Sequence, residues 1–288
     1  MTNRQAMLCA LVAYFLWVLG DAAIKFGGLA ALSPFLIMAI LGLVGAAALA
    51  AFSFFNGTLS ALKPRSLRDQ TQIAATRTII NYVNIIALSH LPLTMFYAVV
   101  FTIPLMVAAL SAMLKYETLT PTKIVCIIAG FLGTLLAIGV HGGGDWKGYL
   151  AAFISAVCFS VSVILMRRTA KTETAESTQF MIALGCSIVG LFGLLGKPFP
   201  APDSGVVVAL VVAGVINIVG GVLYVRAVHN TASTNVTQLH YTQIISGGIL
   251  GYLIWNEIPT WNLIVGSIII IAAGLVVAAQ AKKNDLPQ

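Results

Sequence analysis

The sequence predicts an all-α integral membrane protein with ten transmembrane helices, arranged as two inverted five-helix repeats. Three observations lead to this fold class: the composition, an internal repeat, and an odd number of apolar segments in each half. The 288 residues are 59% hydrophobic and only 9% charged, whereas a soluble domain carries about 25% charged residues. The composition therefore places the chain in a lipid bilayer.

The internal repeat has a spacing of 140 residues, because residues 87–121 align without a gap with residues 227–261. In both copies a polar corner precedes an apolar segment, and a turn containing glutamate follows it. Identical residues coincide at Ala87 and Ala227, Thr94 and Thr234, Thr102 and Thr242, Leu110 and Leu250, and Glu117 and Glu257. We therefore predict one repeat over residues 1–140 and a second over residues 148–281, joined by a glycine-rich connector.

Apolar segments of bilayer-spanning length, roughly 20 residues, occur five times in each half. The expected spans are residues 5–24, 34–54, 71–89, 92–114, 121–140, 148–166, 178–196, 205–225, 234–255 and 261–280. Arg77 interrupts the third span and Pro104 the fourth. Since five is odd, the second half enters the bilayer from the opposite side, which makes the repeat an inverted one.

The basic residues behind the net charge of +7 are concentrated in the loops on one side of the expected membrane. If the amino terminus is cytoplasmic, three lysines lie on the outer side: Lys25, Lys147 and Lys197. The cytoplasmic loops then hold Arg4, Lys63, Arg65, Arg68, Lys115, Lys123, Arg167, Arg168, Lys171, Arg226, Lys282 and Lys283. This is the positive-inside pattern, so we predict that both termini are cytoplasmic and expect no nucleic-acid partner. The first apolar segment has full span length and no cleavage pattern, so we expect it to remain as a membrane helix.

Other functional classes find little support. The four cysteines lie inside spans without ligand-like spacing, so we expect no metal site and no cofactor. The connector HGGGDWK lacks the Gly-Lys-Ser/Thr of a P-loop. The loops are too short for a soluble catalytic domain, and no catalytic residue is predicted. A membrane-embedded lipid enzyme, the remote alternative, would need clustered His, Asp or Glu side chains at one depth.

Inverted repeats are typical of secondary transporters, in which the two halves enclose a site near the bilayer midplane. The chain resembles the drug/metabolite transporter superfamily, specifically its ten-helix branch with paired EamA-type repeats. The motifs that carry this resemblance are the turn from Tyr116 to Pro121, its counterpart from Trp255 to Pro259, the glycine-punctuated spans around Gly130, Gly133, Gly266 and Gly274, and the aromatic opening around Trp17.

The resemblance implies a cavity formed by spans 1–4 and 6–9, with spans 5 and 10 packed together at one edge. The best-matching functional branch is that of bacterial amino-acid exporters, including those for aromatic amino acids. We therefore expect a monomer in the bacterial inner (plasma) membrane, whose partners are the lipid bilayer and a small-molecule substrate.

A polar helix face marks the candidate site. Arg77, Asn81 and Asn84 follow one another at i, i+4 and i+7 in the third span. The 140-residue shift places Arg77 on Asn217 and Asn84 on Tyr224 in the eighth span, again at i and i+7. The predicted substrate-binding residues are Trp17, Arg77, Asn81, Tyr82, Asn84, Tyr97, Phe101, Asn217, Tyr224, Gln238, Tyr241 and Thr242.

Arg77 is the most informative of these residues. A buried arginine costs about 3 kcal/mol on insertion scales, so an interaction must offset it. One interpretation is a guanidinium that binds a carboxylate or phosphate of the substrate. The alternatives are an arginine that extends to the membrane interface, or one paired with a helix carbonyl or with Glu117.

Three further expectations concern the spans on either side of this face. Pro104 removes a helix hydrogen bond and is the candidate gating position. Asp21 and Lys25, at i and i+4, are expected to form a local ion pair. His240 is expected to form an interhelical hydrogen bond. Ion coupling through His240, through Asp21, or none at all are equally compatible with the sequence.

The predicted function is export of small metabolites by alternating access, with amino acids, including aromatic and apolar ones, as the first choice. The alternative is transport of a nucleoside-like or cofactor metabolite, such as S-adenosylmethionine or riboflavin, or of a drug.

Overall fold

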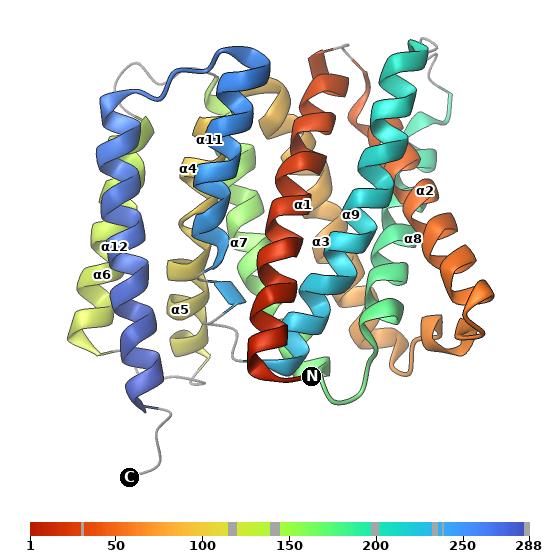
Figure 1. The fold of residues 1–288 in the computed structure, drawn as a ribbon, viewed down its shortest axis with the longest axis horizontal. Coiled ribbons are helices and arrows are strands. Elements are labelled where there is room, and N and C mark those ends of the chain that lie inside the picture. The colour runs from red at the N-terminus through yellow and green to blue at the C-terminus, as the bar shows by residue number, and fades with distance from the viewer. Residues whose placement is uncertain are drawn as a thin grey trace.

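The computed structural model describes residues 1–29, 32–114, 120–138, 145–196, 202–231, 236–237 and 239–284. Every regular element among these residues is a helix (Figure 1). The first half contains α1 (Asn3–Leu29), α2 (Pro34–Phe55), η1 (Leu59–Leu62), α3 (Leu67–His90), α4 (Leu93–Val100), α5 (Ile103–Met113) and α6 (Pro121–Ile138). The second half contains α7 (Trp146–Thr169), α8 (Ala175–Leu194), α9 (Ser204–Asn230), η2 (Leu239–Tyr241), α11 (Thr242–Trp255) and α12 (Trp261–Asn284).

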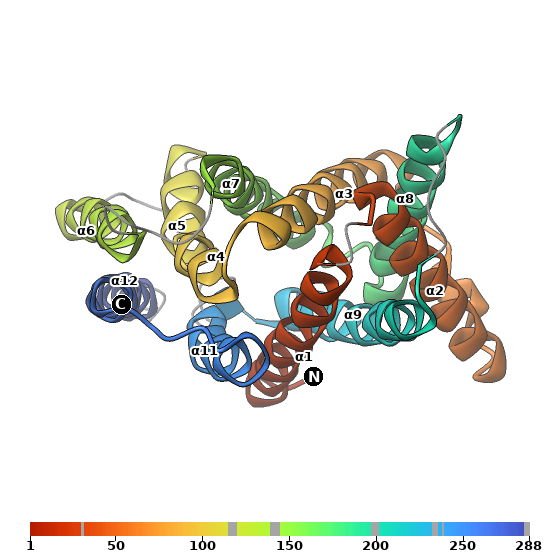
Figure 2. The same ribbon diagram turned by 90° about the horizontal axis from the view of Figure 1, so that it is seen from above.

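The helices pair across the two halves. α1 packs on α9 and α3 on α7, while α2 packs on α8, α4 on α11 and α6 on α12. In repeat order α1 corresponds to α7 and α3 to α9. The contact between α1 and α9 is therefore equivalent to the contact between α7 and α3 when the two halves are exchanged. Seen from above, α6 and α12 lie together at one edge, and α1, α3, α4, α7, α9 and α11 surround the centre (Figure 2). This is the arrangement that the family resemblance implies.

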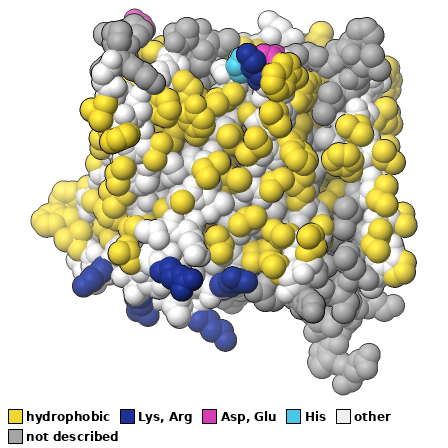
Figure 3. All heavy atoms as spheres, turned by 180° about the vertical axis from the view of Figure 1, so that it is seen from behind, with side chains coloured by type: hydrophobic (Ala, Val, Ile, Leu, Met, Phe, Trp, Pro, Cys, Tyr) yellow, Lys and Arg dark blue, Asp and Glu magenta, His cyan; other side chains and the backbone are white. Residues whose placement is uncertain are grey.

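The surface is that of a membrane protein. Six of the described helices are long and apolar enough to cross a bilayer, within Arg4–Phe26, Pro34–Phe55, Leu93–Leu110, Trp146–Thr169, Ala175–Leu194 and Ser204–Asn230. Large apolar side chains cover the outside (Figure 3), for example Phe55 at 84% and Phe192 at 75% exposure. Small residues such as Ala6, Ala10 and Ala13 are fully buried on α1, because close helix packing replaces the hydrophobic effect in lipid.

The third predicted span forms the helix α3, although it is much less apolar than its neighbours. The Ser66 side chain caps its first turn by accepting from the Asp69 backbone N–H. Gln70, Arg77 and Thr78 are all buried inside the bundle. Part of the polarity that weakens the sequence signal therefore faces inward, although the first turns also carry exposed polar residues such as Arg68 and Gln72.

The fourth span consists of two helices. α4 ends at Val100 and α5 begins at Ile103, so Pro104 is the second residue of α5. A proline ring excludes the carbonyl four residues earlier, here that of Val100, and offers no N–H to it. The bend expected at Pro104 thus appears as a break immediately before it, with the Phe101 N–H bonded to the Tyr97 carbonyl at 2.9 Å.

On the side opposite the amino terminus, Lys25 joins three elements. Its Nζ lies 2.5 Å from Glu257 Oε1 and donates to the Leu91 carbonyl at 3.1 Å. Glu257 also accepts from the backbone N–H groups of Leu93 and Thr94, which open α4. The expected ion pair of Lys25 with Asp21 is therefore wrong: Lys25 turns toward the N-terminus of α4, where the Glu257 carboxylate already lies.

Candidate functional site

A cavity lies at the centre of the bundle, between the two halves. The cavity is partly open, and its empty space together with the adjoining open space amounts to about 1040 Å³. It is lined by α1, α2, α3, α4, α5, α7, α8, α9, η2 and α11. Its polar and aromatic lining residues are Trp17, Asp21, Arg77, Asn81, Asn84, Phe96, Tyr97, Ser155, Phe159, Gln179, Asn217, His240 and Gln243. A lining of this kind suits a small polar molecule that carries an apolar part.

Arg77 is buried in this lining, with 8% exposure. Its guanidinium carbon lies 5.2 Å from the ring centre of Trp17, 4.8 Å from that of Phe159 and 5.9 Å from that of Tyr224. A desolvated cation–π contact contributes about 2 kcal/mol, so these rings can offset the insertion cost of about 3 kcal/mol. No acidic side chain of the described residues forms an ion pair with Arg77. Among the described residues the guanidinium therefore has no anionic partner, and Glu117, one of the partners considered from the sequence, lies outside the described residues.

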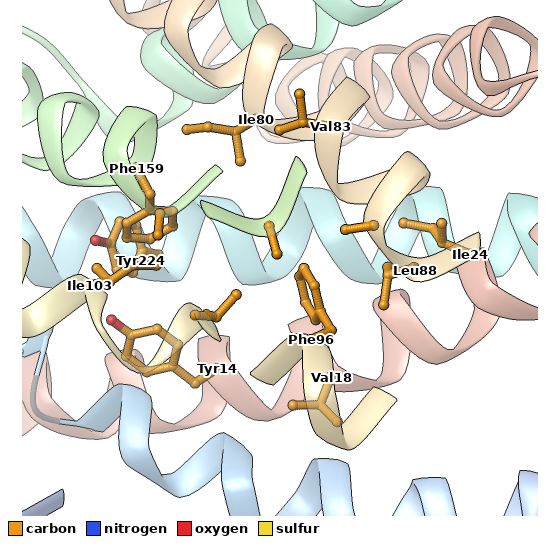
Figure 4. Close-up of a cluster of buried hydrophobic side chains, with 14 of the residues drawn as sticks. Tyr14, Val18, Ile24, Ile80, Val83, Leu88, Phe96, Ile103, Phe159 and Tyr224 are labelled. Carbon is orange, nitrogen blue, oxygen red and sulfur yellow. The ribbon is translucent and has the colours of Figure 1, made fainter. Parts of the chain in front are cut away.

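The rings around Arg77 belong to an aromatic cluster formed by Tyr14, Trp17, Phe159, Tyr224 and His240. The His240 ring stacks on Tyr14 with centroids 4.5 Å apart, and Tyr14 meets Tyr224 edge-on at 5.8 Å. Figure 4 shows Tyr14, Phe159 and Tyr224 converging from α1, α7 and α9. Tyr14 and Tyr224 are fully buried, while Trp17, Phe159 and His240 line the cavity, so the cluster forms part of its wall.

Amide side chains follow Arg77 along the cavity. Asn81 Nδ2 donates to Cys186 Sγ at 3.0 Å. Asn84 Oδ1 is buried and accepts no hydrogen bond from a described residue. Asn217 lies directly against Gly20, where a Cβ would stand 2.6 Å from Asn217 Oδ1. A buried amide oxygen without a donor is costly, so Asn84 is suited to bind a donor group of a ligand.

Asp21 lies in the same cavity. The Tyr97 hydroxyl donates to Asp21 Oδ2 at 2.9 Å, while Lys25 binds Glu257 instead. Lys25 is therefore unavailable to neutralise Asp21, and the carboxylate remains part of the cavity lining.

Half of the predicted site residues line this cavity. They are Trp17, Arg77, Asn81, Asn84, Tyr97 and Asn217. The close spacing of Arg77, Asn81 and Asn84 on one face of α3, and the counterpart position of Asn217 on α9, follow the pattern that the sequence predicts.

Other predicted site residues lie behind the lining. Tyr82 packs against Phe35 with ring centroids 5.3 Å apart, and Phe101 is fully buried and stacks on Tyr97 at 6.2 Å. Tyr224 is buried behind Arg77 as part of the aromatic cluster. Phe101 and Tyr224 therefore support lining residues, whereas Tyr82 packs against a residue outside the lining.

In the ninth span the structure turns a different face toward the cavity. His240 and Gln243 line it, whereas Tyr241 approaches α12, where a Cβ at Gly274 would meet its hydroxyl. Thr242 bonds back to the Leu239 carbonyl at 2.6 Å. His240 and Gln243 are three residues apart and so share one face of this segment, but it is not the face that holds Tyr241 and Thr242. The predicted residue Gln238 lies outside the described residues.

The sequence interpretation missed part of the lining, namely Asp21, Phe96, Ser155, Phe159, Gln179, His240 and Gln243. Helical spacing offered a signal for some of them. Ser155 and Phe159 are four residues apart on α7, and Gln179 and Cys186 are seven apart on α8. The missed residues lie largely in the second half, where polar side chains are smaller and more scattered.

The chain is similar to known membrane transporters in sequence and to a solved structure in fold. A model of the EamA-like transporter family matches the chain twice, at residues 4–139 and 146–279. A solved crystal structure has the same fold, with a TM-score of 0.72 at 22% identity over 98% of this chain and 99% of the other.

Two kinds of curated relative are similar in sequence. One is an S-adenosylmethionine uptake transporter of Rickettsia prowazekii (strain Madrid E), 24% identical over 193 residues, or 67% of this chain and 65% of the relative's length. The other is the aromatic amino acid exporter YddG of Ancylobacter novellus, 30% identical over 118 residues, or 39% of this chain and 41% of the relative's length.

Proposed function

Since the chain belongs to the EamA-like transporter family, we propose that it transports small metabolites with an α-amino-carboxylate head group, amino acids first, by alternating access through the central cavity. The direction that we propose for amino acids is export from the cytoplasm. The two halves, whose helices pack pairwise against each other, are the bodies that would move relative to each other.

The observation that carries this proposal is the state of Arg77. Its guanidinium is buried among three rings and has no anionic partner among the described residues. A guanidinium binds a carboxylate with two parallel hydrogen bonds, and the low polarity of the surroundings strengthens that attraction. A carboxylate on the transported molecule would complete the site.

The rest of the lining suits the other parts of an amino acid. Trp17, Phe96, Tyr97 and Phe159 offer aromatic surface for an apolar or aromatic side chain. Pro104 follows the break between α4 and α5, and we propose that this break bends when the cavity changes sides. A bend there would move Tyr97 relative to α5.

The test is counterflow in proteoliposomes with a panel of amino acids, using wild type and the variants Arg77→Gln and Arg77→Lys. We expect Arg77→Gln to reduce counterflow at least about tenfold, because a charge-assisted bidentate contact is lost. Arg77→Lys should keep part of the activity, since it retains the charge but not the planar fork.

The matched control is Arg68→Gln, an exposed arginine at the start of the same helix, which should transport as wild type does. Size-exclusion profiles and melting temperatures will show that the Arg77 variants are folded. Undiminished transport by folded Arg77→Gln would disprove the role of Arg77.

A second candidate is S-adenosylmethionine itself, which four curated relatives are named for. It bears the same α-amino-carboxylate head group on a larger, nucleoside-containing body. A melting temperature that rises with S-adenosylmethionine but with no amino acid would favour this candidate over the first. Parallel uptake and efflux measurements would establish the direction for either substrate.

A further inference from the structure

We infer that Asp21 binds the cationic ammonium group of the cargo and so selects for zwitterions over simple carboxylic acids. The inference depends on the function proposed above, and it concerns the other end of the same molecule. The observations behind it are the charge of the cavity, the partners of Asp21, and the position of Asp21 relative to Arg77.

The described lining of the cavity contains one arginine and one carboxylate, Arg77 and Asp21, besides the imidazole of His240. Neither charge is neutralised within the described part of the chain: Arg77 contacts rings, and Asp21 contacts only the Tyr97 hydroxyl. A carboxylate and a guanidinium that share a cavity without pairing leave a positive and a negative pole. A zwitterion is the ligand that complements both.

The fold keeps Lys25, the cation nearest to Asp21 in the sequence, from pairing with Asp21. Lys25 lies one helical turn further along α1, but Glu257 binds it at 2.5 Å, and the Leu91 carbonyl also accepts from it. Two backbone N–H groups of α4 in turn hold Glu257 in place. Lys25 therefore has its ionic partner in Glu257 and does not pair with Asp21. The negative pole is thereby kept available.

Tyr97 positions the carboxylate. Its hydroxyl donates to Oδ2 at 2.9 Å, and Oδ1 accepts no hydrogen bond from a described residue. The Tyr97 ring reaches this place because α11 has a glycine opposite it: a Cβ at Gly247 would stand 2.4 Å from Tyr97 Cδ2. One oxygen of Asp21 is held and the other is free for a donor from the cargo.

Asp21 and Arg77 line the same cavity. Trp17 packs on the Arg77 guanidinium, and Asp21 follows Trp17 by four residues, which is about 6 Å along the axis of α1, so the two charged groups lie at different levels of the cavity. Asn84, whose Oδ1 accepts no hydrogen bond from a described residue, belongs to the same lining and is a further acceptor.

The experiment measures binding of matched ligands to purified protein by isothermal titration calorimetry. Phenylalanine and methionine are each compared with the 2-hydroxy acid in which a hydroxyl replaces the ammonium group, and with the amide in which the carboxylate is lost. The proteins are wild type, Asp21→Asn, Tyr97→Phe, Arg77→Gln and Asp203→Asn. Asp203 is an exposed helix-capping carboxylate outside the cavity, and asparagine caps as well as aspartate does.

We expect wild type and Asp203→Asn to prefer the amino acid over its 2-hydroxy acid by about tenfold or more, the usual effect of a charge-assisted hydrogen bond. Asp21→Asn should lose that preference while it keeps the preference for the amino acid over its amide. Arg77→Gln should lose the preference for the amino acid over its amide while it keeps the preference for the amino acid over its 2-hydroxy acid. Tyr97→Phe should weaken the ammonium preference partially, because the carboxylate remains but is no longer held.

The outcomes separate the two proposals. If folded Asp21→Asn binds amino acids but discriminates as wild type does, or weakens all ligands equally, the ammonium site is disproved and the proposed function stands. If wild type neither binds nor transports an amino acid or S-adenosylmethionine, the proposed function fails and this inference fails with it.

Discussion

At the scale of single residues, the charges inside the bundle divide into two kinds. Arg77 and Asp21 line the cavity without an ionic partner among the described residues. Lys25 and Glu257, by contrast, are paired with each other and with backbone groups of α4. The first kind is free to bind cargo, whereas the second stabilises the fold on the side opposite the amino terminus.

The paired kind yields a stability prediction. Glu257→Gln leaves the Lys25 ammonium buried without its anion and weakens the cap on α4, so we expect a loss of about 3–5 kcal/mol. Lys25→Met should cost less, because Glu257 keeps its two backbone donors from Leu93 and Thr94. Melting temperatures in detergent will rank the two variants.

The double variant supplies the control. If the ion pair couples the two residues, its loss of stability will be smaller than the sum of the single losses, by about 0.5–3 kcal/mol. Additive losses would show that Lys25 and Glu257 act independently.

At the scale of elements, α4 and α11 pack against each other in equivalent places of the two halves, and each adjoins an irregular point of the chain. α4 gives way to α5 at the break before Pro104, and the 3₁₀ turn η2 precedes α11. Close approach of the two helices depends on Gly247, against which the Tyr97 ring packs. These irregular elements provide lining residues such as Tyr97, His240 and Gln243.

Two adjacent glycines of α11 test this packing. Gly247→Ala places a methyl group 2.4 Å from the Tyr97 ring, so we expect a loss of about 1–3 kcal/mol from overpacking. Gly248→Ala meets nothing within 4 Å and should stabilise the helix by up to about 1 kcal/mol. Equal melting temperatures for the two variants would contradict the contact between α4 and α11.

At the scale of the whole molecule, the two halves form one pseudo-symmetric bundle with a cavity at their interface. Lysine and arginine side chains gather at the end where α1 begins (Figure 3), and α12 ends on that side too (Figure 1). This asymmetry in positive charge is the feature from which we predict that both termini are cytoplasmic.

Labelling of single cysteines tests that orientation. In a variant whose four native cysteines are replaced by alanine, Ser60→Cys and Asp203→Cys introduce exposed thiols at η1 and before α9, on opposite sides of the bundle. A membrane-impermeant maleimide added to intact cells should label only Asp203→Cys, and lysis should expose Ser60→Cys. Labelling of Ser60→Cys in intact cells would reverse the orientation.

The sequence by itself determined the fold class, because the bilayer imposes rules that are visible in composition and length. An apolar segment of span length must be helical in lipid, and a repeat with an odd number of spans must be inverted. Arg77, Asn81 and Asn84 could be predicted as cavity residues for the same reason, since polar side chains within a span avoid lipid. All three line the cavity.

Only the tertiary structure decided which charges pair and which face of an irregular segment points inward. Local spacing suggested Asp21 with Lys25, but the partner of Lys25 is Glu257, 232 positions away, and no local pattern encodes such a contact. Helical periodicity suggested the face with Tyr241 and Thr242, but His240 and Gln243, on another face of the same segment, line the cavity. Periodicity groups residues on a helix face but does not say which face points inward, and ion pairs in a bundle depend on how distant helices meet.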